Sequence, residues 1–194
     1  IHDSLPLDFE NNPYNLRWQP GAKHGLYLLA EGRLSLQKEQ SDFIAKTGFY
    51  YHSGSFHPLK EGEEDFIHAS NRGCYLIVES TLKTWDHAGK LDGFIQIGSS
   101  PWHKNQHHGY LGVGITFTAD PAIRIPGQAG FAFACATFDR FHGKCETTFE
   151  FYLKHEISPG FYIQPDFQYI LHPGGATPVA DHAFAFLLRT GFQL

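Results

Sequence analysis

The most constraining feature of this 194-residue chain is the spacing of its apolar residues, which alternate with polar residues over most of its length. In one segment, Phe149, Phe151 and Leu153 occupy alternate positions, with Glu150 and Tyr152 between them. Successive side chains of a β-strand point to opposite faces, so a period of two predicts strands with one apolar and one polar face. The chain is therefore expected to be all-β.

The same alternation recurs in nine segments, each bounded by turn-forming residues such as Pro173-Gly174-Gly175. The predicted strands are 26–37, 47–54, 74–84, 92–99, 109–118, 129–138, 147–157, 161–171 and 183–194, and residues 12–19 could form the end of a tenth. No linker or repeat interrupts the pattern. Residues 1–194 are therefore expected to belong to a single domain.

Composition and charge narrow the class of protein further. Aromatic residues make up 15% of the chain, and 20 Gly and 11 Pro provide for many chain reversals, which suits strands joined by turns. The net charge is −5 and no run of Lys and Arg exists, so a nucleic-acid partner is not expected. The chain has no stretch of 18 apolar residues, which argues against a transmembrane helix. A transmembrane strand needs only about 9–11 residues, of which alternate ones are apolar.

Two architectures fit strands with one polar face: a β-sandwich with a polar exterior and a membrane barrel with a polar lumen. The segments are longer than the average globular strand of about 5–6 residues, which favours an antiparallel transmembrane β-barrel. Aromatic residues of the apolar face lie toward the segment ends, as in the interfacial girdles of barrels. They are Phe117, Phe138, Phe149, Phe161 and Phe192.

A resemblance to a known family rests mainly on residues 161–175, which read Phe-Tyr-Ile-Gln-Pro-Asp-Phe-Gln-Tyr-Ile-Leu-His-Pro-Gly-Gly. This stretch resembles the penultimate strand and loop of OprB-type carbohydrate-selective porins. Residues 183–194 look like the last strand of that family, and residues 12–18 and 48–56 resemble its middle portion. The resemblance extends over essentially the whole chain and is strongest after Thr147.

The resemblance implies passive diffusion of mono- or oligosaccharides through a water-filled lumen in the bacterial outer membrane, without enzymatic activity or a cofactor. Family barrels have about sixteen strands, so this chain would supply the C-terminal nine or ten of them. The implied partners are outer-membrane lipid and the insertion machinery, which usually reads a terminal Phe, whereas this chain ends in Phe192-Gln193-Leu194. A homotrimer or membership of an envelope complex stays open.

The residues expected to line the pore are polar or aromatic and lie on the polar face of the predicted strands. The alternative for each of them is a salt bridge or hydrogen bond within the barrel wall. The set comprises Glu31, Arg33, Tyr75, Glu79, Lys83, Glu150, Tyr152, Lys154, Tyr162, Asp166, Gln168 and Arg189.

Other chemistries find little support in the sequence. His103, His107 and His108 share a predicted loop and His52 lies near His57, but without Cys or carboxylates at ligand spacing no metal site is expected. No catalytic motif appears, and Asp166 with Glu150 is better explained as lumen wall than as a hydrolytic pair.

Three cysteines, Cys74, Cys135 and Cys145, leave room for one disulfide, which the sequence does not assign. Two alternative functions also stay open. One is a porin-like barrel that serves as a structural subunit of an envelope complex, and the other is a soluble secreted β-sandwich module that binds carbohydrate.

Overall fold

The computed structural model describes residues 25–38, 41–56, 68–102, 104–105, 107–120, 127–138, 145–175 and 181–192. These residues form nine strands and no helix, and none of them provides a helix that could cross a membrane. The strands are β1 (Tyr27–Lys38), β2 (Ser41–Phe56), β3 (His68–Trp85), β4 (Gly89–Ser99), β5 (His107–Ala119), β6 (Gly127–Phe138), β7 (Cys145–Ser158), β8 (Phe161–Leu171) and β9 (His182–Phe192).

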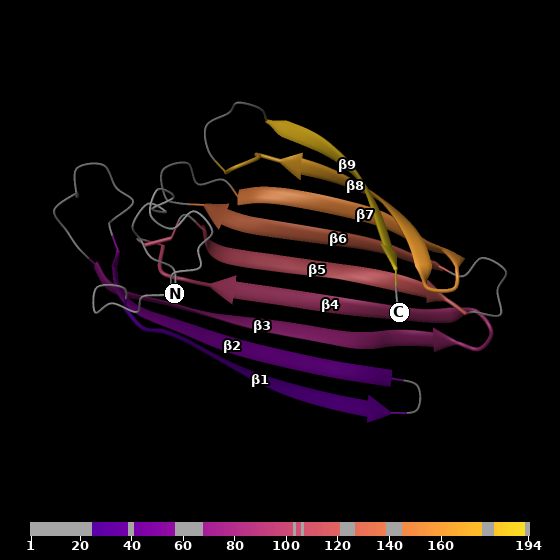
Figure 1. The fold of residues 1–194 in the computed structure, drawn as a ribbon, viewed down its shortest axis with the longest axis horizontal. Coiled ribbons are helices and arrows are strands. Elements are labelled where there is room, and N and C mark those ends of the chain that lie inside the picture. Colours follow the sequence, from indigo (N-terminus) through magenta and orange to yellow (C-terminus); the bar gives the residue numbers. More distant parts are fainter. Residues whose placement is uncertain are drawn as a thin grey trace.

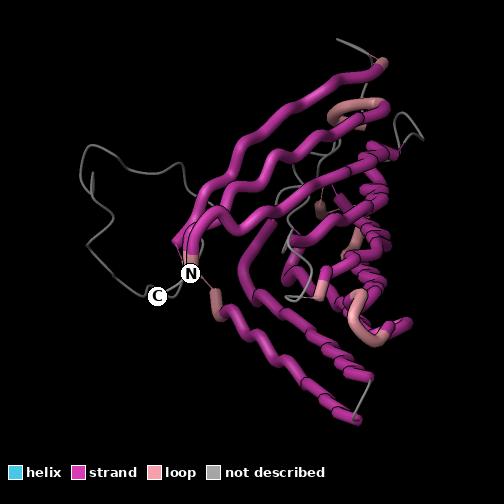
Figure 2. The backbone as a smooth tube through the Cα atoms, turned by 90° about the vertical axis from the view of Figure 1, so that its right-hand side faces the viewer, coloured by secondary structure: helices cyan, strands magenta, loops and turns pink. Residues whose placement is uncertain are grey.

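All nine strands belong to one antiparallel sheet in which each strand pairs with its neighbours in the chain, from β1 to β9 (Figure 1). The nine predicted strands are thus confirmed. The suggested tenth strand, residues 12–19, lies outside the described residues. Seen from the side, the strands form a single curved wall rather than two packed layers (Figure 2). The β-sandwich alternative is therefore wrong for this part of the chain.

Several strands are longer than the alternation predicted. β2 begins at Ser41 instead of residue 47, and β3 begins at His68 instead of residue 74. As a result, the connections at one end of the sheet are shorter than expected and comprise residues 39–40, 86–88, 120–126 and 159–160. The connections at the other end are mostly longer, with residues 57–67 and 172–181 as the two longest. Short turns at one end and long loops at the other are typical of outer-membrane barrels.

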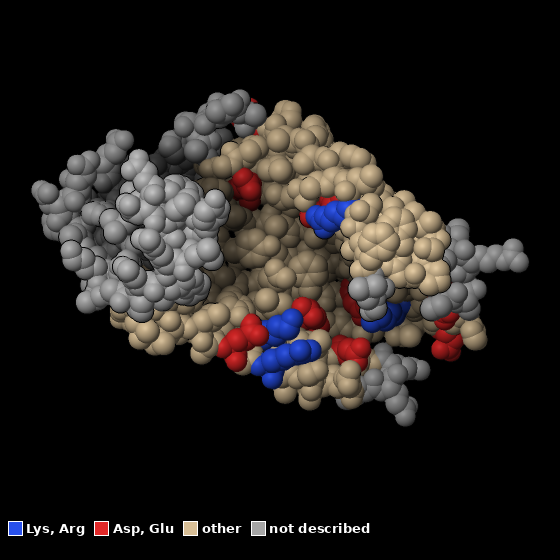
Figure 3. Space-filling view, viewed as in Figure 1, with Lys and Arg blue, Asp and Glu red and all other residues tan. Residues whose placement is uncertain are grey.

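The register divides the side chains into two faces. Phe151 of β7 pairs with Phe167 of β8, which pairs with Phe186 of β9, and we call the face that carries this row the outer face. The adjacent row, which includes Glu150 and Gln168, belongs to the opposite, inner face. The inner face is hollowed, and Lys, Arg, Asp and Glu side chains gather around the hollow (Figure 3).

Burial is the reverse of what a water-soluble sheet requires. Within the described ranges no apolar side chain is buried, whereas the buried polar side chains there are Asn71 and Asp166. Many of the large apolar residues are exposed instead, with Phe186 at 73% as an example. Because exposed apolar area in water costs about 25 cal/mol per Å², such an outer face is stable only against another apolar medium.

Near the strand ends, the aromatic contacts fit the expected girdle at one end of the sheet. At the end with the short turns, Phe161 packs on Phe192 with ring centroids 4.8 Å apart. At the opposite end, Phe138 packs on His107 with ring centroids 4.1 Å apart. Phe138 lies two residues beyond Ala136, which is on the inner face, so its expected place in the apolar-face girdle is wrong. Amphipathic and aromatic rings of this kind are enriched where a barrel crosses the two membrane–water interfaces.

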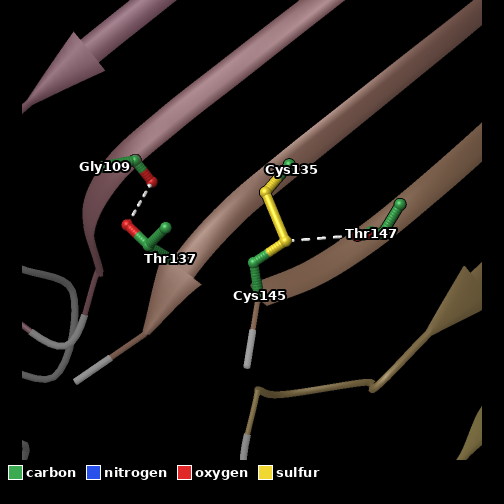
Figure 4. The surroundings of a disulfide bond; sticks show 5 residues. All are labelled: Gly109, Cys135, Thr137, Cys145 and Thr147. Carbon is green, nitrogen blue, oxygen red and sulfur yellow. Dashed lines mark hydrogen bonds between the residues drawn. A yellow bond between two sulfur atoms is a disulfide. The ribbon is translucent and has the colours of Figure 1, made fainter. Parts of the chain in front are cut away.

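A disulfide joins Cys135 of β6 to Cys145 of β7, with Cα atoms 5.9 Å apart (Figure 4). The two residues lie on neighbouring strands, and the Cys145 sulfur also contacts the Thr147 hydroxyl at 3.2 Å. The bond closes the hairpin whose connection is residues 139–144. Cys74 is the free thiol, and it is exposed. The disulfide that the sequence left open is thus assigned, in keeping with an oxidising compartment.

Candidate functional site

The inner face concentrates the charged residues of the sheet in three clusters. The first, which we call the Arg189 cluster, consists of Glu150, Asp166, Gln168 and Arg189 on strands β7 to β9. The Arg189 guanidinium lies 2.7 Å from Asp166 Oδ2 and 3.9 Å from Glu150 Oε1. Gln168 Nε2 donates a hydrogen bond of 2.9 Å to Glu150. The cross-strand register brings these four side chains together because Glu150 pairs with Gln168.

Asp166 is the most enclosed residue of the Arg189 cluster. Its side chain is 0% exposed, whereas that of Arg189 is 47% exposed. A carboxylate without water around it needs a paired cation, since an isolated buried charge is very costly. Arg189 therefore provides the cation beside Asp166, and because its own side chain is half exposed it can donate further hydrogen bonds into the hollow.

The second cluster lies on strands β1 to β3. Lys46 forms an ion pair of 3.3 Å with Glu79, and the Tyr75 hydroxyl donates a hydrogen bond to Glu31. Arg33 is the cross-strand partner of Lys46 and so shares the inner face with it. This cluster thus contains two cations, Arg33 and Lys46, and two carboxylates, Glu31 and Glu79, so neither sign dominates it.

The third cluster was not predicted from the sequence. Lys90 lies 3.0 Å from Asp92, and the Thr81 hydroxyl donates a hydrogen bond of 2.8 Å to the same carboxylate. A groove of about 450 Å³ runs along this part of the inner face, and its lining reaches Gln128 and Tyr152. A sugar ring presents hydroxyl groups around its edge, and this groove offers both donors and acceptors for them.

Aromatic residues of the inner face lie among these charges. The Tyr152 hydroxyl is hydrogen-bonded to Thr116 at 3.1 Å. The Lys154 ammonium lies 4.1 Å from the centroid of the Tyr162 ring, which is a cation–π contact. Of the residues expected to line the pore, eleven lie on the inner face by register. They are Glu31, Arg33, Tyr75, Glu79, Glu150, Tyr152, Lys154, Tyr162, Asp166, Gln168 and Arg189.

Lys83 is the exception, because β3 contains a bulge. The register shifts between Thr81 and Lys83, so that Leu82 is an extra residue and Lys83 pairs with Leu91 on the outer face. The ammonium of Lys83 lies 5.0 Å from the centre of the Trp85 ring. The structure thus places Lys83 on the outer face beside Trp85, the last residue of β3, contrary to its expected place on the pore wall.

The β4–β5 connection folds against the start of β3 at the end with the long loops. Asn105 and Asn71 exchange two side-chain hydrogen bonds of 2.8 and 3.1 Å, and Lys104 donates one to the Ser70 carbonyl. Desolvation, together with the nearby Arg72, lowers the pKa of Lys104 from its ordinary value. These contacts tie the connection to the mouth of the hollow.

Metal-binding side chains do not converge in the described part of the chain, where no group of three His, Cys, Asp or Glu forms a candidate site. His107 packs on Phe138, and His52 accepts a hydrogen bond of 3.1 Å from the Gly54 backbone. His57 and His103 lie outside the described residues.

Comparisons with known proteins agree with this geometry. The family model described as carbohydrate-selective porin, OprB family, matches residues 2–194. A solved structure, the high-pH structure of Pseudomonas putida OprB, superposes with a TM-score of 0.75 and 17% sequence identity. The superposition covers 87% of this chain and 49% of that one, so the chain spans about half of its structural relative. No curated protein matches the chain. Because the family model extends over nearly the whole sequence, the chain belongs to the OprB family of carbohydrate-selective porins.

Proposed function

We propose that this chain forms part of the wall of a water-filled pore through which sugars diffuse passively across the bacterial outer membrane. The main support for this proposal is that the two faces of the sheet bear opposite kinds of side chains, polar on one and apolar on the other. The inner face bears ion pairs such as Arg189 with Asp166, whereas the outer face exposes Phe and Leu side chains. A polar inner wall with an apolar exterior is the pattern of a membrane barrel with an aqueous lumen.

Neutral sugars suit a wall of mixed charge. Arg189 and Lys46 can donate hydrogen bonds to sugar hydroxyls, and Glu150 and Glu79 can accept them. Since Lys46 and Arg189 each lie beside a carboxylate, these parts of the wall offer hydrogen bonds without a strong net field that would select ions of one sign. The flat rings of Tyr75 and Tyr152 add apolar faces for the C–H surfaces of a sugar.

The pore needs further strands to close. β1 and β9 are the two edges of the sheet, and an unpaired strand edge is not tolerated in hydrocarbon. We therefore propose that these strands are the C-terminal part of one porin barrel, whose other strands pair with β1 and β9. Insertion by the outer-membrane assembly machinery and assembly into a homotrimer belong to the same proposal.

Liposome swelling tests the transport function. Proteoliposomes that contain the whole protein should swell quickly in glucose and more slowly in a charged solute of the same size, such as gluconate. A shift in mobility between heated and unheated gel samples confirms that the barrel is folded. Folded protein that produces no swelling with glucose would contradict sugar transport and would favour a structural role in the envelope.

A further inference from the structure

Three aromatic rings of the inner face lie directly over glycines of the neighbouring strand. Gly130 of β6 pairs with Tyr152 of β7, and Gly48 of β2 pairs with Tyr75 of β3. Tyr162 of β8 pairs in the same way with Gly191 of β9. Gly73 with Tyr50 and Gly114 with Phe94 repeat the arrangement elsewhere on the inner face.

The rings occupy the space that a side chain on each glycine would need. A Cβ atom added to Gly130 would lie 2.1 Å from Cε1 of Tyr152, and one added to Gly48 would lie 2.2 Å from Cε1 of Tyr75. A Cβ atom on Gly191 would lie 2.6 Å from the Tyr162 ring. Ordinary contacts between carbon atoms are about 3.5–4.0 Å, so no other residue is compatible with these ring positions.

Backbone conformation does not explain these glycines. The described glycines with positive φ are Gly25, Gly89, Gly160, Gly174 and Gly175, and none of them lies under one of the three rings. Glycine inside a strand also weakens the strand, because it has no side chain to pack and a larger entropy to lose. The ring in the space above each glycine is therefore the local feature that requires it.

Each ring is also fixed at a second point. The hydroxyl of Tyr152 is hydrogen-bonded to Thr116, and that of Tyr75 is hydrogen-bonded to Glu31. The Tyr162 ring has the ammonium of Lys154 over its centre. The rings are thus held against the wall instead of extending into the hollow.

We propose that Gly48, Gly130 and Gly191 are positioning residues that set the free width of the lumen, by holding three tyrosine rings flat on the pore wall. This inference deepens the proposed pore function and rests on it. It also divides the rings into two kinds. Tyr75 and Tyr152 keep a ring face available to a passing sugar, whereas Lys154 covers that of Tyr162.

Gly130→Ala is the sharpest test, because Gly130 has the shortest of these distances. The methyl group would push the Tyr152 ring by roughly 1–2 Å to reach an ordinary contact, and the open side of the ring is the lumen. In planar bilayers, the single-channel KCl conductance of the whole protein should fall by roughly one tenth to one third. The rate of liposome swelling with glucose should fall in the same direction.

Gly98→Ala is the matched control, since Gly98 lies on the inner face and a Cβ there would meet its nearest atom, in Tyr110, at an ordinary 3.8 Å. Its conductance should equal that of the wild type. Tyr152→Ala should raise the conductance, and adding Gly130→Ala to Tyr152→Ala should change nothing further, because the ring is gone. A loss of structure alone would not produce this coupling.

The inference is overturned if folded Gly130→Ala conducts like the wild type, or if Gly130→Ala lowers conductance equally with and without Tyr152. If Gly130→Ala does not fold, the double variant, which lacks the clash, must fold and conduct like Tyr152→Ala, and its failure to do so also overturns the inference. Conductance reports the width of the lumen whatever the solute. A wild type that conducts ions but passes no glucose would therefore contradict the sugar function. The conductance of the glycine variants would still test whether these glycines set the width of the lumen.

Discussion

The inner and outer faces of the same nine strands differ in how their side chains are partnered. On the inner face, polar groups are paired with one another, as Arg189 is with Asp166 and Lys46 is with Glu79. On the outer face, Phe131, Phe151 and Phe186 are each close to half exposed or more. Side chains of adjacent residues are thus suited to different media, water on the inner face and hydrocarbon on the outer face.

Because the two faces have different surroundings, stability and permeation should be separable in this fold. Changes on the outer face should act on insertion and folding, because they alter the contact with lipid. Changes on the inner face should act mainly on what passes through the pore. An exception is a buried inner residue such as Asp166, which should affect both.

The largest effect is expected from a charge on the outer face. Phe131 lies in the middle of β6 and is 48% exposed, so Phe131→Arg should destabilise the folded barrel by about 2–4 kcal/mol. Unfolding by urea in lipid vesicles measures this loss. Ala132→Arg is the matched control, because Ala132 is the next residue, lies on the inner face and pairs with Glu150. Equal destabilisation by both variants would contradict the assignment of one face to lipid and the other to water.

The next effect concerns the enclosed carboxylate. Arg189→Ala leaves Asp166 without its cation, and because Arg189 is itself half exposed the expected loss of unfolding free energy is about 1–3 kcal/mol. Asp166→Asn should cost less, since it removes the charge that needs a partner. The double variant should recover part of the loss caused by Arg189→Ala. Losses that simply add would show that the two side chains do not interact.

The smallest effect separates two lysines. Lys46→Gln removes a cation from the inner face and leaves Glu79 unpaired, so the pore should become more selective for cations. The reversal potential in a KCl gradient should shift in that direction. Lys83→Gln removes the same charge from the outer face and should leave the reversal potential unchanged. A shift of equal size for Lys83→Gln would contradict its placement beyond the bulge.

The alternation of apolar residues was sufficient to predict all nine strands and the face of eleven pore-wall candidates. It could not predict how far the strands extend, because Ser41, Asp42 and Lys46 are as common in turns as on a polar strand face. Lys46 and Lys90 were missed for this reason, since both fell in predicted connections.

The strand register and the β-bulges could not be predicted from the sequence either. The pairing of Glu150 with Gln168 depends on how β7 and β8 are aligned, which no single strand encodes. The extra residue Leu82 transfers Lys83 to the other face without any change in the pattern of residue types. The sequence offered no reason for a glycine at position 130 inside a predicted strand, and the Tyr152 ring on the neighbouring strand explains it.

Chemical labelling of single cysteines along β7 shows which of its side chains face water. In a Cys74→Ser background, positions 150 to 153 are replaced by Cys one at a time in the whole protein, and a charged, water-soluble thiol reagent is added to membranes. We expect fast labelling at 150 and 152, which face the lumen, and little at 151 and 153, which face lipid. Equal labelling at all four positions, or the opposite alternation, would contradict the assignment of the inner face as the wall of an aqueous pore.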